Sequence, residues 1–140
     1  MKKMKMSLAV AAIVVGAVAV PAGAANAADL GGWSEETGSF STSSTPTGVS
    51  VRAAAASTVK HTGKAETTVK AGTTNKRAHG WTTWAGVYHY TTARMETYSG
   101  SVVYNTSGRQ WGTSGTEAIS PWRAATKADG TGSARTYYGK

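Results

Sequence analysis

The feature that most limits what this chain can fold into is the shortage of large aliphatic side chains after residue 28. An amphipathic helix needs about three to four apolar residues in every two turns, so the ten aliphatic residues in this region cannot fill a helical bundle. Tyr and Trp bury large areas and keep a polar group at the rim, so aromatic side chains must supply much of any core. The aliphatic residues are Leu30, Val49, Val51, Val59, Val69, Val87, Met95, Val102, Val103 and Ile119.

The sequence after Val59 has the pattern of an all-β protein. Thr and Tyr abound there, and both favour pleated surfaces. Turn signals that contain glycine recur at the intervals typical of an all-β sandwich or barrel. One short helix is expected near 116–119. The predicted strands cover 65–70, 81–92, 94–104, 109–112, 121–127 and 133–138.

The last predicted strand shows the alternation expected of a sheet with two different faces. Successive side chains of a strand point to opposite sides, so this strand divides its residues into two sets. One face carries Ala134, Thr136 and Tyr138, and the other carries Ser133, Arg135 and Tyr137.

The first 27 residues have the three parts of a secretory signal peptide. Three lysines lie near the start, a run of apolar and small residues covers 8–20, and Pro21 ends the run. Small residues of the kind that signal peptidase accepts follow at 25–27. The alternative, a membrane anchor, needs about 20 apolar residues, and this run is shorter. We therefore expect cleavage between Ala27 and Ala28 and a secreted, extracellular product.

Removal of this leader lowers the formal net charge from +8 to +5, because three lysines leave with it. The remaining chain has a length that suits one domain. It contains no cysteine, so a thiol catalyst and a cysteine-bound zinc site are excluded. Small secreted domains often depend on disulfides, and this one must fold on packing and hydrogen bonds alone.

The segment 28–58 differs in composition from the rest of the chain. It is rich in Ser, Thr and Gly and contains a run of alanines at 53–56. Such a stretch buries too little apolar surface to offset its ordering entropy, so we expect it to be flexible or loosely packed, and a processed pro-segment is one form of this. An ordinary edge strand or two is the alternative that remains open.

No recognisable catalytic or metal-binding arrangement occurs in the sequence. The histidines His61, His79 and His89 lack an i,i+4 pair and a ligand-rich loop, so we expect no metal and no cofactor. The acids are scattered, and no nucleophile elbow of the Gly-x-Ser-x-Gly kind is present. We therefore expect no enzymatic activity.

The charge balance favours anionic partners. From Trp81 onward, six Lys and Arg residues accompany only three acids. A cationic face on an exported protein suits cell-wall polymers, phosphate-bearing lipids or acidic proteins, whereas nucleic acid is not expected in that compartment. A solvated surface that serves solubility is the equally supported alternative.

Ten of the twelve aromatic residues lie at or after Trp81, where they serve as core, as an exposed platform or as both. Most of the tryptophans are more simply core. Because Tyr137 and Tyr138 are neighbours on a predicted strand, they point to opposite faces, and one of them is expected at an exposed or rim position. Exposed Tyr and Trp are the usual anchors of an interface.

Five segments of the chain are VYHY at 87–90, TYSGSVV at 97–103, NTSGRQ at 105–110, WRAAT at 122–126 and ARTYY at 134–138. Their order and spacing resemble the lactococcin 972 family of secreted bacteriocins. The resemblance covers roughly residues 81–140, and GGW at 31–33 is similar to the start of the family's mature chains.

This resemblance implies a cationic β-sandwich of two small antiparallel sheets, which we place over 59–140. It also implies a protein that acts on Gram-positive relatives. The founding member is a homodimer that binds the cell-wall precursor lipid II and blocks septum formation, so the resemblance implies a homodimer and lipid II as partner.

The sequence therefore predicts an antibacterial protein that acts on the cell envelope without covalent chemistry. A secreted surface-interaction or structural module without toxicity is the second hypothesis. Arginine grips phosphate and aromatic rings stack on sugar faces, and lipid II carries both groups. The contact surface expected on these grounds consists of Tyr88, His89, Tyr90, Arg109, Trp111, Tyr137 and Tyr138.

Overall fold

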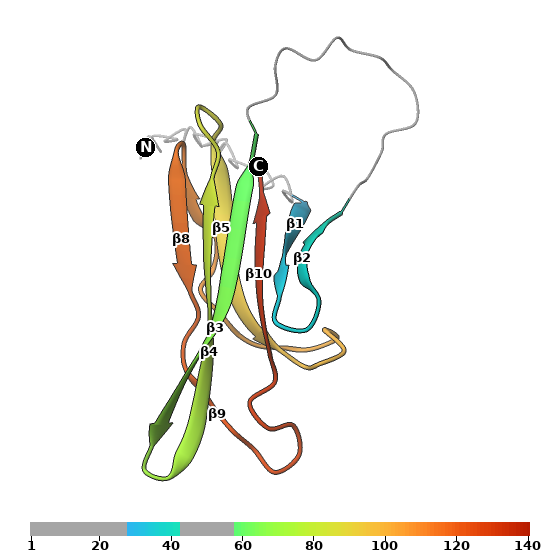
Figure 1. Ribbon diagram of the computed structural model, residues 1–140, viewed down its shortest axis with the longest axis vertical. Coiled ribbons are helices and arrows are strands. Elements are labelled where there is room, and N and C mark those ends of the chain that lie inside the picture. Colours follow the sequence, from blue (N-terminus) through green and yellow to red (C-terminus); the bar gives the residue numbers. More distant parts are fainter. Residues whose placement is uncertain (1–27, 43–57) are drawn as a thin grey trace, which may run out of the picture.

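The computed structural model describes residues 28–42 and 58–140, which form two antiparallel sheets packed face to face (Figure 1). The larger sheet has the order β2-β1-β10-β5, and β6 and β7 both pair with β5. Its strands are β1 (Asp29–Ser34), β2 (Gly38–Ser41), β5 (His89–Glu96), β6 (Val103–Thr106), β7 (Gln110–Gly112) and β10 (Ser133–Gly139).

The smaller sheet has the order β3-β4-β8, and β9 pairs with β4. Its strands are β3 (Lys60–Lys70), β4 (Thr73–Thr83), β8 (Gly115–Ile119) and β9 (Arg123–Ala124). The predicted all-β fold, a small sandwich of two antiparallel sheets, is confirmed. No helix long and apolar enough to cross a membrane occurs within residues 28–42 and 58–140.

Several predicted strand boundaries are wrong because turns were not recognised. The predicted strand 81–92 is two strands, since β4 ends at Thr83 and the chain turns at Gly86, whose φ is +71°, before β5 begins. The predicted strand 94–104 is likewise interrupted between β5 and β6, where Gly100 has a φ of +74°. Within the predicted strand 121–127, only residues 123–124 form a strand, and Thr126 makes an isolated bridge to Gly130.

The helix expected near 116–119 is also wrong, because these residues belong to β8. Thr116 and Ala118 are buried between the sheets, whereas Glu117 and Ile119 are exposed. This period of two is the signature of a strand with one buried face, and the sequence shows it as an alternation of small and large side chains.

The prediction that the whole of 28–58 is loosely packed is wrong for residues 29–41. Strand β1 lies between β2 and β10 in the larger sheet, so the alternative of one or two strands holds for this part. Trp33 supplies the apolar side chain that this segment was thought to lack, and it packs against the buried core. Residues 43–57 lie outside the described residues, as does the predicted signal peptide.

The interior between the sheets has two chemically different halves. In the apolar half, Trp33, Ala65 and Tyr104 pack around a fully buried group. That group consists of Ala78, Ala93, Met95, Ala118 and Ala134. Four small alanines let the sheets approach closely, so that one methionine and flanking aromatic rings can fill the space.

In the polar half, hydroxyls and an imidazole form one chain of hydrogen bonds between the sheets. Thr91 Oγ1 lies 2.6 Å from Thr116 Oγ1 and 2.6 Å from Thr82 Oγ1. His61 continues the chain, with Nδ1 2.8 Å from Thr82 Oγ1 and Nε2 2.8 Å from Thr136 Oγ1. Buried polar groups must be hydrogen-bonded, and this chain meets that requirement.

A pair of glycines lies where the two halves meet. Gly63 and Gly80 are cross-strand neighbours on the inner face of the smaller sheet. A Cβ at Gly63 would lie 2.7 Å from the Trp33 ring, and one at Gly80 would lie 2.7 Å from the Thr136 side chain. The missing side chains therefore make room for residues from β1 and β10.

Candidate functional site

A group of three aromatic rings, two of them exposed, lies on the outer face of the larger sheet, where β5 begins. The rings of Tyr88 and Trp111 stack with centroids 5.1 Å apart and planes 14° from parallel. Tyr90 meets Trp111 edge-on at 4.9 Å, and the Arg109 guanidinium lies 4.5 Å from the centre of the Tyr90 ring. We call these four residues the aromatic cluster. Tyr88 is 61% exposed and Trp111 is 41% exposed, whereas Tyr90 is fully buried. Tyr90 was predicted as a contact residue, and its burial corrects that prediction, because the ring supports the cluster from within.

The local sequence explains why these side chains meet. Tyr90 and Trp111 are directly paired residues of β5 and β7, so they share one face of the sheet. Tyr88 ends the turn that connects β4 to β5. That turn is held by two backbone bonds, from Trp84 N to Ser114 O at 2.9 Å and from Val87 N to Trp84 O at 3.2 Å.

His89 does not belong to the exposed surface, which corrects one predicted contact residue. It alternates with Tyr88 and Tyr90, so its side chain points between the sheets and is fully buried. Its Nδ1 donates a hydrogen bond to the Val87 carbonyl oxygen at 2.7 Å. The histidine therefore braces the turn that presents Tyr88 and makes no contact with an outside partner.

Tyr138 is a further correction. Its side chain lies in the interior at 9% exposure, 5.0 Å from the His61 ring and 6.4 Å from the Trp84 ring, centroid to centroid. Its neighbour Tyr137 points to the outer face of the larger sheet, as the predicted alternation requires. Of the two tyrosines, only Tyr137 shares the face of the aromatic cluster.

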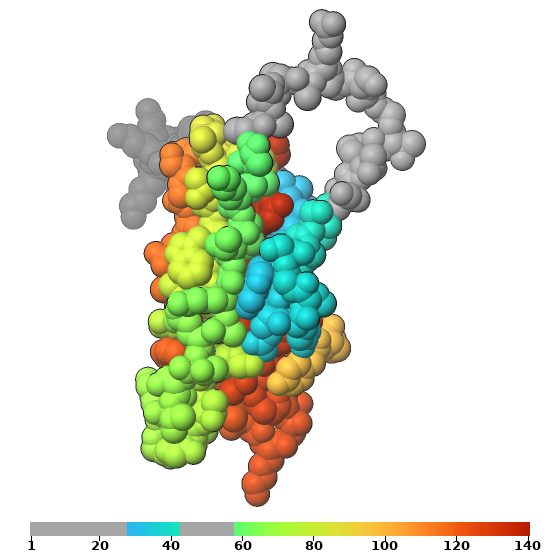
Figure 2. All heavy atoms as spheres, in the orientation of Figure 1, coloured from blue at the N-terminus to red at the C-terminus, as the bar shows by residue number. Residues whose placement is uncertain are grey.

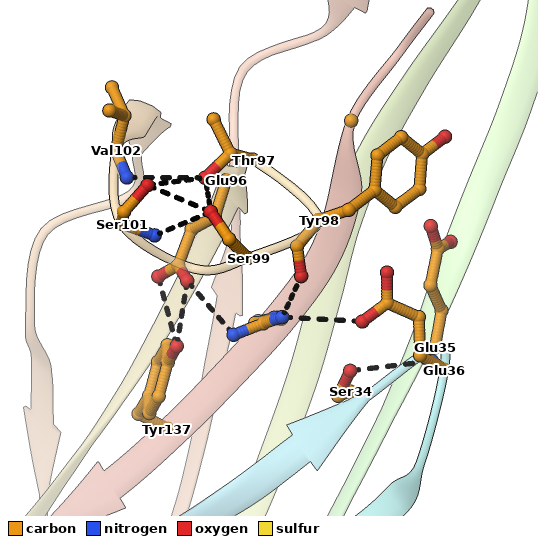
Figure 3. Close-up of polar contacts among 12 residues, drawn as sticks. Ser34, Glu35, Glu36, Glu96, Thr97, Tyr98, Ser99, Ser101, Val102 and Tyr137 are labelled. Atoms are coloured by element: carbon orange, nitrogen blue, oxygen red, sulfur yellow. Dashed lines mark hydrogen bonds and ion pairs between the residues drawn. The ribbon is translucent and has the colours of Figure 1, made fainter. Parts of the chain in front are cut away.

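Tyr137 lies in a separate environment from the aromatic cluster. Its hydroxyl donates to both Glu96 carboxylate oxygens, at 2.9 and 3.0 Å (Figure 3). The Arg94 guanidinium lies 4.7 Å from its ring centre, and Phe40 meets it edge-on at 6.0 Å. Burial and the charge of Glu96 raise the pKa of Tyr137 to about 12, so its hydroxyl stays a hydrogen-bond donor at neutral pH.

Acids and arginines alternate in a row across the same face. Asp29 and Arg94 approach to 3.9 Å, and Arg94 and Glu96 approach to 3.9 Å. Arg135 lies 3.6 Å from Glu96 and 3.2 Å from Glu36. We call these five residues the charge row. Because Asp29 and Glu36 come from the N-terminal hairpin, the row joins that hairpin to β5 and β10.

The charge row also reaches the aromatic cluster. The Tyr90 hydroxyl donates to Asp29 Oδ1 at 2.6 Å. Burial, followed by this bond, raises the pKa of Tyr90 to about 12. Sequence reasoning missed the row, although the outward positions of β5 carry Tyr90, Arg94 and Glu96 at a spacing of two or four. Asp29 could not be placed, because its partners are more than 60 residues away.

A loop rich in hydroxyls folds over the far end of the charge row (Figure 3). Ser99 Oγ lies 3.1 Å from Thr97 Oγ1 and 2.8 Å from Ser101 Oγ. Arg135 Nη2 donates to the Tyr98 carbonyl oxygen at 2.8 Å and so anchors the loop from below. These contacts are internal to the protein and support the loop.

The outer face of the smaller sheet carries a second group of charges, centred on Glu66. Its carboxylate contacts His79 at 2.9 Å, Lys64 at 2.9 Å and Arg77 at 2.7 Å. His79 and Lys64, followed by Arg77, lower the pKa of Glu66 to about 2. The His79 ring also packs against the Trp81 ring, with centroids 3.8 Å apart and planes tilted by 31°. Within residues 28–42 and 58–140, no group of acids and histidines is arranged to hold a metal, and no pocket is present.

The aromatic cluster is therefore the part of the predicted contact surface that the fold brings together. It combines two exposed rings, which can stack on the apolar face of a sugar, with an arginine whose fork of N–H groups matches phosphate. Comparison of the chain with known proteins adds no relative: no protein-family model, no curated protein and no solved structure matches it.

Proposed function

We propose that this protein is a secreted, bacteriocin-like antibacterial protein that binds a component of the Gram-positive cell envelope without covalent chemistry, with lipid II as the ligand. The observation that carries the proposal is the exposed, stacked pair of Tyr88 and Trp111 beside Arg109. Lipid II joins sugars to a pyrophosphate, and this group of side chains offers a partner for each.

The stacked pair is suited to a sugar because it is both exposed and rigid. One side chain comes from the turn before β5 and the other from β7, and the two rings hold each other in place. Binding therefore costs little further loss of side-chain freedom. His89 holds the turn below Tyr88 through the Val87 carbonyl. A ligand therefore meets a preformed apolar surface.

Arg109 supplies the charge for the pyrophosphate. A guanidinium has five donors in a planar fork, and the Tyr90 ring below it fixes the orientation of that plane. The Tyr90 ring is in turn fixed by the bond from its hydroxyl to Asp29. Arginine, ring and carboxylate thus form one braced unit.

The proposal is tested by the binding of purified protein, residues 28–140, to lipid II in vesicles. Trp111→Ala should weaken binding at least tenfold, because truncation of a central aromatic anchor removes about 2 kcal/mol or more. The matched control is Tyr98→Ala, which removes another exposed ring (55% exposed) from the loop between β5 and β6. Equal loss in both variants, or in neither, would contradict the proposed site.

Growth of dividing Gram-positive cells separates the functional hypotheses. Inhibition that added lipid II relieves supports the full proposal. Inhibition that lipid II leaves unchanged keeps the antibacterial activity and discards this ligand. Absence of inhibition by folded protein across a panel of strains favours the second hypothesis, an interaction module without toxicity.

A further inference from the structure

The end of the sandwich opposite the aromatic cluster concentrates positive charge. The tip of the β3–β4 hairpin and the segment around β9 lie together there, at the lower end in Figures 1 and 2, because Asn75 pairs with Ala124 and Lys76 pairs with Arg123. The two segments, 69–77 and 121–130, carry five cations and one acid, Asp129. We call the five cations the cationic end: Lys70, Lys76, Arg77, Arg123 and Lys127.

Two of these cations are committed to acids elsewhere in the fold. Lys76 Nζ lies 2.8 Å from Glu35 and also donates to the Gly132 carbonyl oxygen at 3.1 Å. Arg77 contacts Glu66 through both Nε and Nη2, at 2.7 Å each. The remaining three make no ion pair with any carboxylate in the part of the chain that the structure describes. They are Lys70, Arg123 and Lys127.

Aromatic rings hold several of these side chains in position. The Arg123 guanidinium lies 3.4 Å from the centre of the Tyr104 ring, and Lys70 Nζ lies 5.8 Å from the centre of Trp122. Arg77 lies over the same Trp122 ring at 4.4 Å. Contacts of this kind attract a cation to the ring face and reduce the side-chain freedom that binding would otherwise remove.

We propose that the cationic end binds a linear anionic polymer of polyol units joined by phosphodiesters. Lys70, Arg123 and Lys127 lie on different elements, so a ligand with repeating charges meets several of them at once and gains from multivalency. Arginine adds a preference for phosphate, which it can grip in bidentate fashion. This site is separate from the aromatic cluster and does not depend on lipid II.

The same geometry argues against single-stranded nucleic acid as the polymer. Binding of that class relies on aromatic rings that are open to stacking by bases. Here Tyr104 is covered by Arg123, and Trp122 is covered by Arg77. Both rings are only partly exposed, so the end offers charge without a stacking platform.

The experiment measures the affinity of the purified secreted protein for linear polyglycerol phosphate over a range of salt concentrations. The variant Lys70→Gln/Arg123→Gln/Lys127→Gln should bind at least tenfold more weakly. The slope of log Kd against log salt concentration should fall by about two to three, because each cation that neutralises a phosphate releases about one counterion. The matched control, Lys60→Gln/Lys64→Gln/Lys140→Gln, removes the same net charge elsewhere and should keep most of the affinity.

Equal weakening in the two triple variants would overturn the site, because overall charge would then explain the binding. Tighter binding of single-stranded DNA or of a polycarboxylate of matched charge would overturn the assignment of a polyol phosphate as the ligand. If the triple variant does not fold, Lys127→Glu repeats the test with a single change at an exposed loop position. Lipid II binding should be unchanged in all cationic-end variants, so failure of this proposal is distinguishable from failure of the proposed function.

Discussion

The two halves of the interior achieve the same packing of sheet on sheet by different chemistry. The apolar half relies on Met95 among alanines, with ring carbons around them. The polar half relies on His61 and four threonines in one hydrogen-bonded chain. The difference teaches that a chain poor in aliphatic residues can still build a sandwich, provided that every hydroxyl it buries in this way finds a partner.

The difference also predicts unequal responses to mutation and to acid. Stability in the apolar half comes from area removed from water and from close contact, neither of which depends on pH. Stability in the polar half depends on matched donors and acceptors and on a neutral imidazole. Each of the following changes perturbs one half of the interior and leaves the other half unchanged for comparison.

The largest effect is expected for Met95→Ala in the apolar half. This change empties the centre of the buried group and should lower the free energy of unfolding by about 3 kcal/mol, within the range for large-to-small core substitutions. Denaturant unfolding monitored by tryptophan fluorescence measures it. Met95→Leu, which conserves volume, should cost less than about 1.5 kcal/mol. A loss below 1 kcal/mol for the alanine variant would show that the half has no tight core.

A fall in pH should act on the polar half through His61. Burial lowers the pKa of His61 from 6.5 to about 4. Between these values the unfolded chain binds a proton at this site that the folded chain does not bind, so stability declines as the pH falls from 6.5 to 4. The decline should reach up to about 3 kcal/mol, since one pKa unit corresponds to about 1.4 kcal/mol.

The matched variant for this pH effect is His61→Gln, which can still hydrogen-bond but does not titrate. Its free energy of unfolding should change less between pH 6.5 and 4 than that of the parent. Unfolding curves at several pH values give both slopes. Parallel slopes for the two proteins would contradict the assignment of this pH dependence to His61.

The smallest effect is expected from a change of one hydroxyl. Thr91→Val removes the group that links Thr82 to Thr116 and should cost about 1–2 kcal/mol, because partners are left unsatisfied. Thr92→Val is the matched control, since the next hydroxyl along β5 is buried but has no hydrogen-bond partner among the described residues. Thr92→Val should leave the free energy of unfolding unchanged or raise it. Equal losses of stability in the two variants would contradict the contribution of the hydroxyl chain to stability.

The sequence predicted the class of fold well because composition and turn signals act locally. The strand at 133–138 and its alternation are confirmed by β10, and 109–112 corresponds closely to β7. The N-terminal hairpin was missed because its stability is not local. Trp33 finds its core partners, and Asp29 finds Tyr90 and Arg94, only after distant strands have come together.

The candidate site was predicted in part for the same reason. Residue chemistry selected Tyr88, Tyr90, Arg109 and Trp111, and the pairing of β5 with β7 brings them together. It could not separate them from His89, because side chains one position apart on a strand face opposite sides and the register decides which is buried. The exposed or rim position expected for one of the last two tyrosines corresponds to Tyr137, which is half-buried on the outer face.

The pairing of β1 with β10 sets an order of events for each new molecule. Of the strands that the structure describes, β1 is made early and β10 is made last, yet β10 lies between β1 and β5 at the centre of the larger sheet. Such contacts between distant parts of a chain form slowly. The larger sheet therefore cannot close until β10 has been made, and until then β1 and β5 lack the strand that lies between them.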